Sequence, residues 1–367
     1  MTAIMPTKKQ GILTPKLIDL NNISDEQLLS CRIGDLPISI EGTWLEVCVN
    51  QLYAELEAKG LVFRPECYLA DEWLTPENEV AIGIPFYLSH PTLIKLERRM
   101  MLEAEGEGKL WCMQLLRHEA GHAFSYAYHL HQKPEWQKVF GSSLEEYGDT
   151  YKFKPYSKSY VRHLDGFYAQ YHPDEDFVET FAVWLTPDSD WQNKYQGWKA
   201  LDKLRFVDEL MSSIKGVKPL KPKGKKLWHH KNLTITLDKY YKKKYRNEQE
   251  EFPDFHDIQL GKIFTALTDE EWWAFKKDRH KNSEIVTAQE LIRKHSKIFI
   301  NSIDRCTGER KYIISDLLKN IALRAQQLHM IVAQPQAVAL MQLSVYVTSL
   351  TMNYVHTGWL RGTRERP

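Results

Sequence analysis

Residues 110–127 read Leu-Trp-Cys-Met-Gln-Leu-Leu-Arg-His-Glu-Ala-Gly-His-Ala-Phe-Ser-Tyr-Ala. This long apolar run predicts a helix buried in the core of a domain. On such a helix His118 and His122 lie one turn apart on one face, close enough to bind one metal ion, with Glu119 beside them. Burying these three side chains without partners is costly, and a shared metal ion removes that cost. Gly121 is a poor helix former, so it indicates that another segment approaches closely here.

A hydrolytic zinc site needs a third protein ligand and keeps its fourth position for water. One common source of that ligand is an extension of the motif, with a glycine at position 125 and a histidine at position 128. This chain has Ser125 and Tyr128 instead, which excludes the extension. The other source is a carboxylate from a later helix.

Residues 171–185 read Tyr-His-Pro-Asp-Glu-Asp-Phe-Val-Glu-Thr-Phe-Ala-Val-Trp-Leu and predict that helix. Pro173 suits its first turn, and the three acidic residues that follow suit the positive end of its dipole. Glu175 and Glu179 are four residues apart and therefore share a face. One of them can bind the metal while the other accepts the free ring N–H of a ligand histidine.

The segments His-Glu-Ala-Gly-His at 118–122 and Glu-Asp-Phe-Val-Glu-Thr-Phe-Ala at 175–182 together resemble the gluzincin group of zinc metallopeptidases. More narrowly, they resemble a bacterial family of zinc-binding metallopeptidases with the signature His-Pro-x-Glu-Asp-(Phe/Trp)-Ala-Glu-Thr-(Phe/Trp)-Ala. The chain departs from that signature at Val178, where the family has alanine. The resemblance covers residues 30–215.

The resemblance implies an α+β, zincin-like metallopeptidase domain, with a small sheet, an active-site helix and a helical lower half. It implies one Zn²⁺ per chain, with Glu175 as the third ligand and Glu179 as the residue that orients a ligand histidine. In the more distant lethal-factor-type peptidases, a tyrosine seven residues before the third ligand steadies the oxyanion. That position is Tyr168 in this chain. From the residues alone, His163 is a further candidate donor to the tetrahedral intermediate.

The predicted function is therefore zinc-dependent hydrolysis of peptide bonds, most simply by an endopeptidase. Glu119 would take a proton from the attacking water as general base and then protonate the leaving amine. A peptide or protein substrate is the partner that this reaction implies. The alternative is a catalytically silent protein in which zinc stabilises a binding or assembly surface on the same scaffold. Glu119 argues against that alternative, because a structural site needs only the ligands.

Composition supports a folded protein and limits its partners. The chain has 367 residues, of which 43% are apolar, and a net charge of +1, so no strong overall field selects polyanions. Five scattered cysteines without a Cys-x-x-Cys pair predict a reducing compartment, the cytoplasm. The best membrane candidate, 337–355, is interrupted by polar residues and predicts a buried helix, so no membrane partner is expected.

Four regions are predicted along the chain. Residues 1–22 form a flexible N-terminal arm, 23–215 the metallopeptidase domain, 216–246 a basic linker or surface segment, and 247–367 a helical C-terminal region. Residues 215–246 hold twelve Lys or Arg against one acid, Asp238. A solvated surface is the simpler interpretation, and nucleic acid is not expected as a partner because no nucleic-acid motif accompanies the charge.

Further elements are predicted from periodicity and turn signals. A short helix follows Ser24, a second spans 44–58, and a third opens at His90-Pro91. Two strands are expected at 61–69 and 80–88, and residues 79–88 are the candidate exposed edge strand that could pair with substrate beside the active-site helix. The stretch 130–172 is expected to be loop-like. Helices in the C-terminal region are expected at 269–280, 286–297, 312–333 and 335–357, with a turn at Thr307-Gly308.

Overall fold

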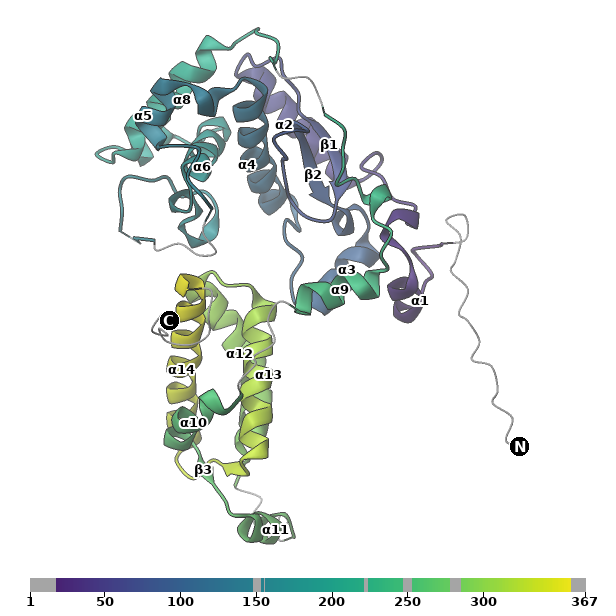
Figure 1. Ribbon diagram of the computed structural model, residues 1–367, viewed down its shortest axis with the longest axis vertical. Helices are drawn as coiled ribbons and strands as arrows, with labels where there is room; N and C mark the ends of the chain where they lie inside the picture. Colours follow the sequence, from purple (N-terminus) through teal and green to yellow (C-terminus); the bar gives the residue numbers. More distant parts are fainter. Residues whose placement is uncertain are drawn as a thin grey trace.

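The computed structural model describes residues 18–147, 153–154, 156–220, 224–246, 253–277 and 285–357. Helices dominate these residues, and two small sheets accompany them, so the fold belongs to the α+β class as predicted. Figure 1 shows two bodies, one containing α1 to α9 and the other α10 to α14. Each body has its own large cluster of buried apolar side chains.

The first body is built around three central helices and a small parallel sheet. The helices are α2 (Trp44–Ala58), α4 (Lys109–Ala127) and α6 (Pro173–Leu185), and α4 packs against the other two. The sheet pairs β1 (Glu66–Ala70) with β2 (Ala81–Pro85), and β2 also contacts α4. The predicted helices at 44–58, at 110–127 and after Pro173 are thereby confirmed.

Shorter helices surround this centre. They are α1 (Asp25–Ser30), α3 (Pro91–Met101), α5 (Pro134–Phe140), α7 (Trp191–Lys194), α8 (Ala200–Ser213) and α9 (Leu237–Arg246). Five 3-10 segments join them: Ile33–Asp35, Phe86–Ser89, Leu130–Gln132, Asp165–Gln170 and His230–Asn232. The helices after Ser24 and at His90-Pro91 are confirmed, and Ser24 forms a capping box with Gln27. The expectation that 130–172 is loop-like was wrong at α5, which begins at a proline in its first turn.

Two close contacts fix the central helix α4. Arg117 donates two hydrogen bonds, both 2.7 Å long, to the Glu55 carboxylate of α2, and both side chains are buried. The second contact is with α6, where Gly121 lies directly against Val178. A Cβ added at Gly121 would stand 2.8 Å from the Val178 Cβ. The prediction of a close approach at Gly121 is confirmed, and this approach lets α4, which carries His118 and His122, meet α6, which carries Glu175.

The predicted strands are shorter than expected, and the predicted edge strand was wrong. The chain from residue 86 onward turns into a 3-10 segment instead of continuing β2. All five residues of β2 are buried. Gly83 also exchanges two hydrogen bonds with Leu74, because the connection between the strands folds back along the side of β2 that faces away from β1. Residues 79–88 therefore do not offer a free edge to a substrate.

Both ends of the predicted peptidase domain are extended by packed residues. Residues 1–17 of the predicted arm lie outside the described residues, while Ile18 and Leu20 are buried in the core of the first body. In the predicted basic segment, α9 places Leu237, Tyr240 and Tyr241 in that same core. Lys239, Lys242 and Lys243 are exposed, whereas Lys244 pairs with the buried Glu97. The segment therefore joins the first body while keeping a basic surface.

The second body is a small helical bundle. It contains α10 (Asp257–Ile263), α11 (Asp269–Lys277), α12 (Ala288–Thr307), α13 (Lys311–Gln327) and α14 (Gln336–Thr357), with β3 (Thr265–Ala266) antiparallel to β4 (Met330–Ile331). In Figure 1, α12, α13 and α14 lie side by side, in agreement with their contacts. Helices are present at all four predicted C-terminal positions, and the turn at Gly308 is confirmed. Two helix ends were wrong: α12 runs ten residues past its expected end at 297, and α13 stops at Gln327 rather than at 333, because the chain turns there into β4. Residues 278–280 of the helix predicted over 269–280 lie outside the described residues. None of the described helices is long and apolar enough to cross a membrane.

The start of α13 joins the two bodies. Tyr312 and Ile313 belong to the core of the first body. Ile314 and the later buried apolar residues of α13 belong to the core of the second. Gly308, in the turn before α13, lies against Gly166 of the 3-10 segment Asp165–Gln170. This segment leads directly into α6. The second body therefore contacts a part of the chain next to the α4–α6 pair.

Candidate metal centre

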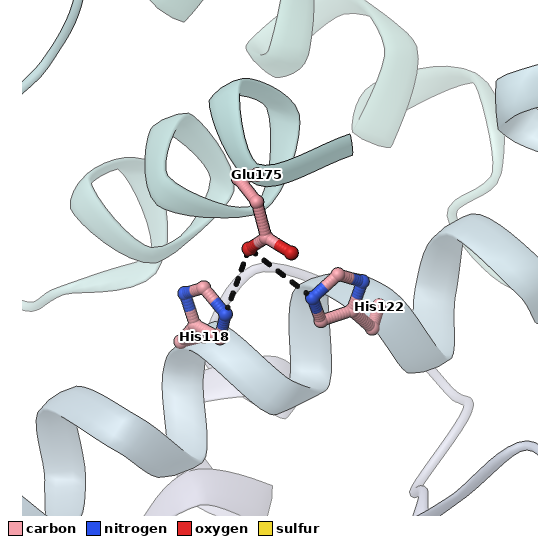
Figure 2. A group of neighbouring side chains, drawn as sticks. All are labelled: His118, His122 and Glu175. Carbon is pink, nitrogen blue, oxygen red and sulfur yellow. Dashed lines mark ion pairs between the residues drawn. The ribbon is translucent and has the colours of Figure 1, made fainter. Parts of the chain in front are cut away.

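Three side chains from α4 and α6 converge on one point between the helices. Figure 2 shows the His118 and His122 rings rising from α4 toward the Glu175 carboxylate on α6. The Oε2 atom of Glu175 lies 3.2 Å from Nε2 of His118 and 3.5 Å from Nε2 of His122. Zinc binds nitrogen and oxygen at about 2.0–2.1 Å, which places tetrahedral ligand atoms about 3.3 Å apart. The three side chains could therefore hold a metal ion.

The charges at this point favour a cation. Glu175 Oε2 is buried, and apart from the two imidazoles it has no partner among the described residues. Burial raises the pKa of Glu175, but the nearby His122 and His118 lower it more, so the net pKa lies well below its usual range. Burial likewise lowers the pKa of His118, and the hydrogen bonds and charges of Glu175 and Glu179 outweigh that effect and raise it. A metal ion would supply the positive charge that these carboxylates otherwise draw as a proton.

Glu179 fixes the orientation of His118. The Nδ1 atom of His118 lies 2.8 Å from Glu179 Oε1, so the tautomer protonated at Nδ1 donates there and leaves Nε2 as a ligand atom. The other oxygen of Glu179 accepts a 2.9 Å hydrogen bond from the backbone N–H of Leu164. Glu179 is fully buried, and it ties His118 to the segment that precedes Tyr168.

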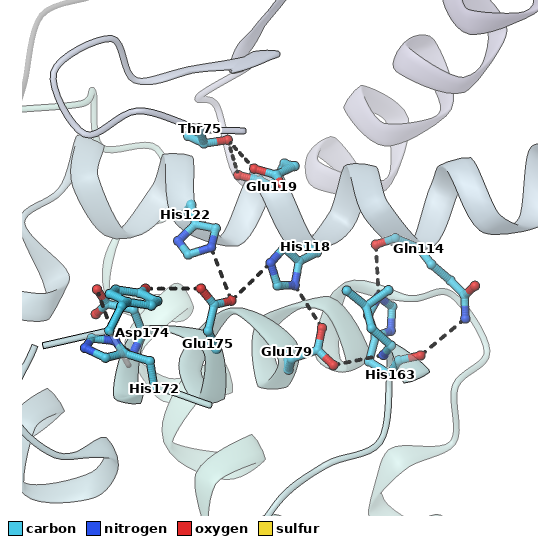
Figure 3. Close-up of polar contacts among 12 residues, drawn as sticks. Thr75, Gln114, His118, Glu119, His122, His163, His172, Asp174, Glu175 and Glu179 are labelled. Atoms are coloured by element: carbon cyan, nitrogen blue, oxygen red, sulfur yellow. Dashed lines mark hydrogen bonds and ion pairs between the residues drawn. The ribbon is translucent and has the colours of Figure 1, made fainter. Parts of the chain in front are cut away.

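Glu119 also lies on α4, beside the His118–His122–Glu175 group but not part of it. Its side chain is buried, and Figure 3 shows it turned toward Thr75. The Thr75 hydroxyl donates a 2.8 Å hydrogen bond to Glu119 Oε2. Burial raises the pKa of Glu119 above its usual range, against the opposing charges of His118 and His122. A carboxylate with a raised pKa is suited to accept a proton and later release it.

Tyr168 is brought to the ligand group by a bent segment of backbone. Its ring centroid lies 5.7 Å from that of His118. Burial raises the pKa of the Tyr168 hydroxyl, and the neighbouring charges of Glu175 and Glu119 raise it further, so the hydroxyl remains a hydrogen-bond donor at neutral pH. The residue before it, Phe167, has a φ of 59°. A bulky residue in the left-handed region is strained, and such strain is concentrated at functional sites.

His163 is placed on the far side of Glu179 from Glu175. Its Nε2–H donates a 2.9 Å hydrogen bond to the backbone carbonyl of Gln114 on α4. Burial lowers its pKa, which favours the neutral ring. Figure 3 shows His163 beside Glu179 and Gln114 and away from His122. A direct role in catalysis stays a prediction for this residue, while a role in joining the 163–168 segment to α4 follows from its contacts.

No family model, curated protein or solved structure matches the chain significantly. The geometry of the residues themselves is therefore the ground on which a function can be argued.

Sequence reasoning missed three side chains that complete this centre. They are Thr75, which holds Glu119; Tyr147, whose hydroxyl donates a 3.1 Å hydrogen bond to Glu175 Oε1; and His172, which caps α6. A signal existed for His172, because His90-Pro91 and His172-Pro173 begin two helices in the same way. In each case the ring Nδ1 accepts a backbone N–H two residues later. Thr75 and Tyr147 lie in irregular segments, where no periodic pattern marks them.

Proposed function

We propose that this chain is a zinc-dependent peptidase with a zincin-like fold, in which His118, His122 and Glu175 hold the metal. The observation that carries the proposal is the convergence of two imidazole nitrogens on one carboxylate oxygen, at 3.2 and 3.5 Å from it. Two histidines and one glutamate are a ligand set that zinc peptidases use, with the fourth position kept for water. Glu119 lies next to this group without being one of its ligands.

The reaction can be assigned to residues of the chain. Zinc would supply a Lewis acid that acidifies water and polarises a peptide carbonyl. Glu119 would accept the proton of the attacking water and return it to the leaving amine, and Thr75 would hold its carboxylate in place. Tyr168 would donate a hydrogen bond to the oxyanion. Glu179 would keep His118 in the tautomer that can bind metal.

We also propose a reducing compartment, the cytoplasm, as its location. All five cysteines are present as free thiols, and three of them are buried. Buried thiols in an oxidising compartment would be expected to be paired. A thiol count on the denatured native protein tests this part of the proposal.

The function is tested by metal analysis followed by digestion of a peptide library. We expect about one zinc ion per chain, and cleavage that stops after chelation and returns with zinc. Glu119→Gln should keep the metal and lower the cleavage rate about 10²- to 10⁴-fold, because general-base catalysis contributes on that order. Glu209→Gln, an exposed carboxylate on α8, is the matched control and should cleave normally.

Two results would overturn the proposal in different ways. Full cleavage by Glu119→Gln would show that the mechanism is wrong. Zinc bound at one equivalent per chain, with no cleavage of any library peptide, would instead favour a binding or assembly protein on this scaffold.

A further inference from the structure

We infer that Tyr147 is a positioning residue that makes Glu175 present a single oxygen, Oε2, to the metal. The inference rests on the proposed metal centre and concerns how the centre is built. Nothing in the sequence pattern assigns Tyr147 this role, since it lies 28 residues before Glu175 in an irregular segment.

The two oxygens of Glu175 have different surroundings. Oε2 faces both Nε2 atoms, whereas Oε1 accepts the 3.1 Å hydrogen bond from the Tyr147 hydroxyl. A carboxylate can bind a metal through one oxygen or through both. A donor on Oε1 favours the form in which that oxygen stays away from the metal.

The hydroxyl of Tyr147 is held in place by its ring. The ring stacks on His172 at a centroid distance of 3.9 Å and an interplanar angle of 15°. His172 is itself buried and fixed at both nitrogens: Nδ1 accepts from the Asp174 N–H, and Nε2–H donates to the Glu145 carbonyl. The stacking partner therefore belongs to the cap of α6, the helix that carries Glu175. Tyr147 and Glu175 are positioned by the same helix start.

The consequence is an open coordination position. Three one-atom ligands leave the fourth tetrahedral position for water, while a two-oxygen carboxylate would crowd that position. Partners of metal ligands tune affinity as well as geometry, and their removal costs 10–100-fold in metal affinity or activity. Tyr147 would thus set both the affinity of the site and the room left for the attacking water.

The test compares metal binding by the wild-type protein with metal binding by the Tyr147→Phe variant. This substitution removes the hydroxyl and keeps the stacked ring. Zinc affinity is measured by competition with a chelator, and coordination by the visible absorption of the Co²⁺-loaded protein. We expect Tyr147→Phe to bind zinc about tenfold more weakly. We also expect its Co²⁺ absorption to weaken, as it does when a four-coordinate site gains a ligand. Tyr156→Phe is the matched control, because Tyr156 is 92% exposed.

The outcomes separate this inference from the proposed function. If the wild-type chain binds no zinc, the proposed centre itself fails. If the wild type binds zinc and Tyr147→Phe has the same affinity and the same Co²⁺ spectrum, the centre stands and the role of Tyr147 is refuted. Melting of the chelated proteins shows whether the two chains fold equally well. A lower melting temperature with an unchanged Co²⁺ spectrum would mean a structural role only and would also refute the inference.

Discussion

The two bodies of this protein differ most in what they bury. Among the described residues, the first body buries thirteen ionisable side chains that carry a carboxylate, guanidinium or imidazole: Glu55, Glu79, Glu97, Arg117, His118, Glu119, His122, His131, His172, Glu175, Asp176, Glu179 and His230. The described part of the second body buries one such side chain, His256, which lies 2.7 Å from the Tyr346 hydroxyl. Both bodies are helical, so helix content alone does not separate a site from a scaffold.

The difference shows where the chain retains uncompensated charge. Buried charges are normally paired, as Arg117 is with Glu55 and Lys203 with Asp176. Glu119, Glu175 and Glu179 are buried together, and no lysine or arginine of the described chain forms an ion pair with them. Their hydrogen-bond partners are imidazoles, hydroxyls and the backbone N–H of Leu164. Three carboxylates around two histidines leave a deficit of positive charge that a divalent cation would fill.

The largest predicted effect is the loss of metal binding, which should alter the first body and leave the second unchanged. His122→Ala removes one of three ligands and should weaken zinc binding at least about 100-fold, since even partners of ligands are worth 10–100-fold. Removing the metal should also reduce the hydrogen-exchange protection of α4 and α6, because metal-binding free energy contributes to folding. Protection of α12 and α13 should be unchanged. Competition titration and exchange with mass spectrometry measure the two effects.

A matched change in the second body is the control for His122→Ala. Ile321 is fully buried in its core, and Ile321→Ala should cost about 2–5 kcal/mol of unfolding free energy. It should leave zinc affinity unaltered. If Ile321→Ala weakened zinc binding as strongly as His122→Ala does, the two bodies would be one thermodynamic unit, and the contrast between site and scaffold would be lost.

Two glycines, one in each body, should respond in opposite ways to substitution by alanine. Gly121 touches Val178 across the α4–α6 contact, while a Cβ added at Gly261 in α10 would meet nothing within 4 Å. Gly121→Ala should cost about 1–3 kcal/mol, because overpacking forces the helices apart. Since those helices carry opposite sides of the metal centre, zinc affinity should fall too. Gly261→Ala should stabilise the chain by up to about 1 kcal/mol, the helix propensity of alanine over glycine.

Denaturant unfolding of both variants, with and without zinc, measures this contrast. Equal effects of the two substitutions would mean that α4 and α6 can separate freely. The close approach at Gly121 would then have no bearing on the site.

The helices and the His118–His122 pair could be predicted from the sequence because each is encoded locally, whereas the choice of Glu175 over Glu179 came from the family resemblance. The spacing of His118 and His122 places them on one helical face wherever the helix lies, and Pro173 marks the start of α6 within one turn of Glu175. Gly121 was informative for the same reason, since a glycine in a helix interior needs a packing explanation.

The remaining parts depend on contacts that no local pattern carries. Thr75 reaches Glu119 across 44 residues, and Tyr147 reaches Glu175 across 28. The apolar run around β2 looks the same whether it is an edge or a buried strand, so the fold-back of Leu74 onto Gly83 was not foreseen. In α9 the lysines dominate the composition and hide the buried Tyr240 and Tyr241.

The smallest predicted effect concerns a buried imidazole of the first body away from the metal. Burial, together with the neighbouring charge of His229, lowers the pKa of His230 from 6.5 to about 4. Below pH 6.5 the unfolded chain takes up a proton at this residue that the folded chain does not. The folded state therefore loses stability as the pH falls from 6.5 toward 4, and not as it rises. After an allowance for solvent screening, we expect this loss to be about 1–2 kcal/mol.

His230→Gln should remove that part of the pH dependence. The measurement is denaturant unfolding between pH 8 and pH 4 on chelated protein, so that protons competing with zinc do not contribute. His295→Gln in α12 is the control for removal of an imidazole from the second body. If His230→Gln and wild type lost stability in parallel from pH 6.5 to 4, the burial of His230 would not contribute to the pH dependence of the unfolding free energy. The pH dependence of the first body between pH 6.5 and 4 would then come from its other buried ionisable groups, among them the three carboxylates at the α4–α6 contact.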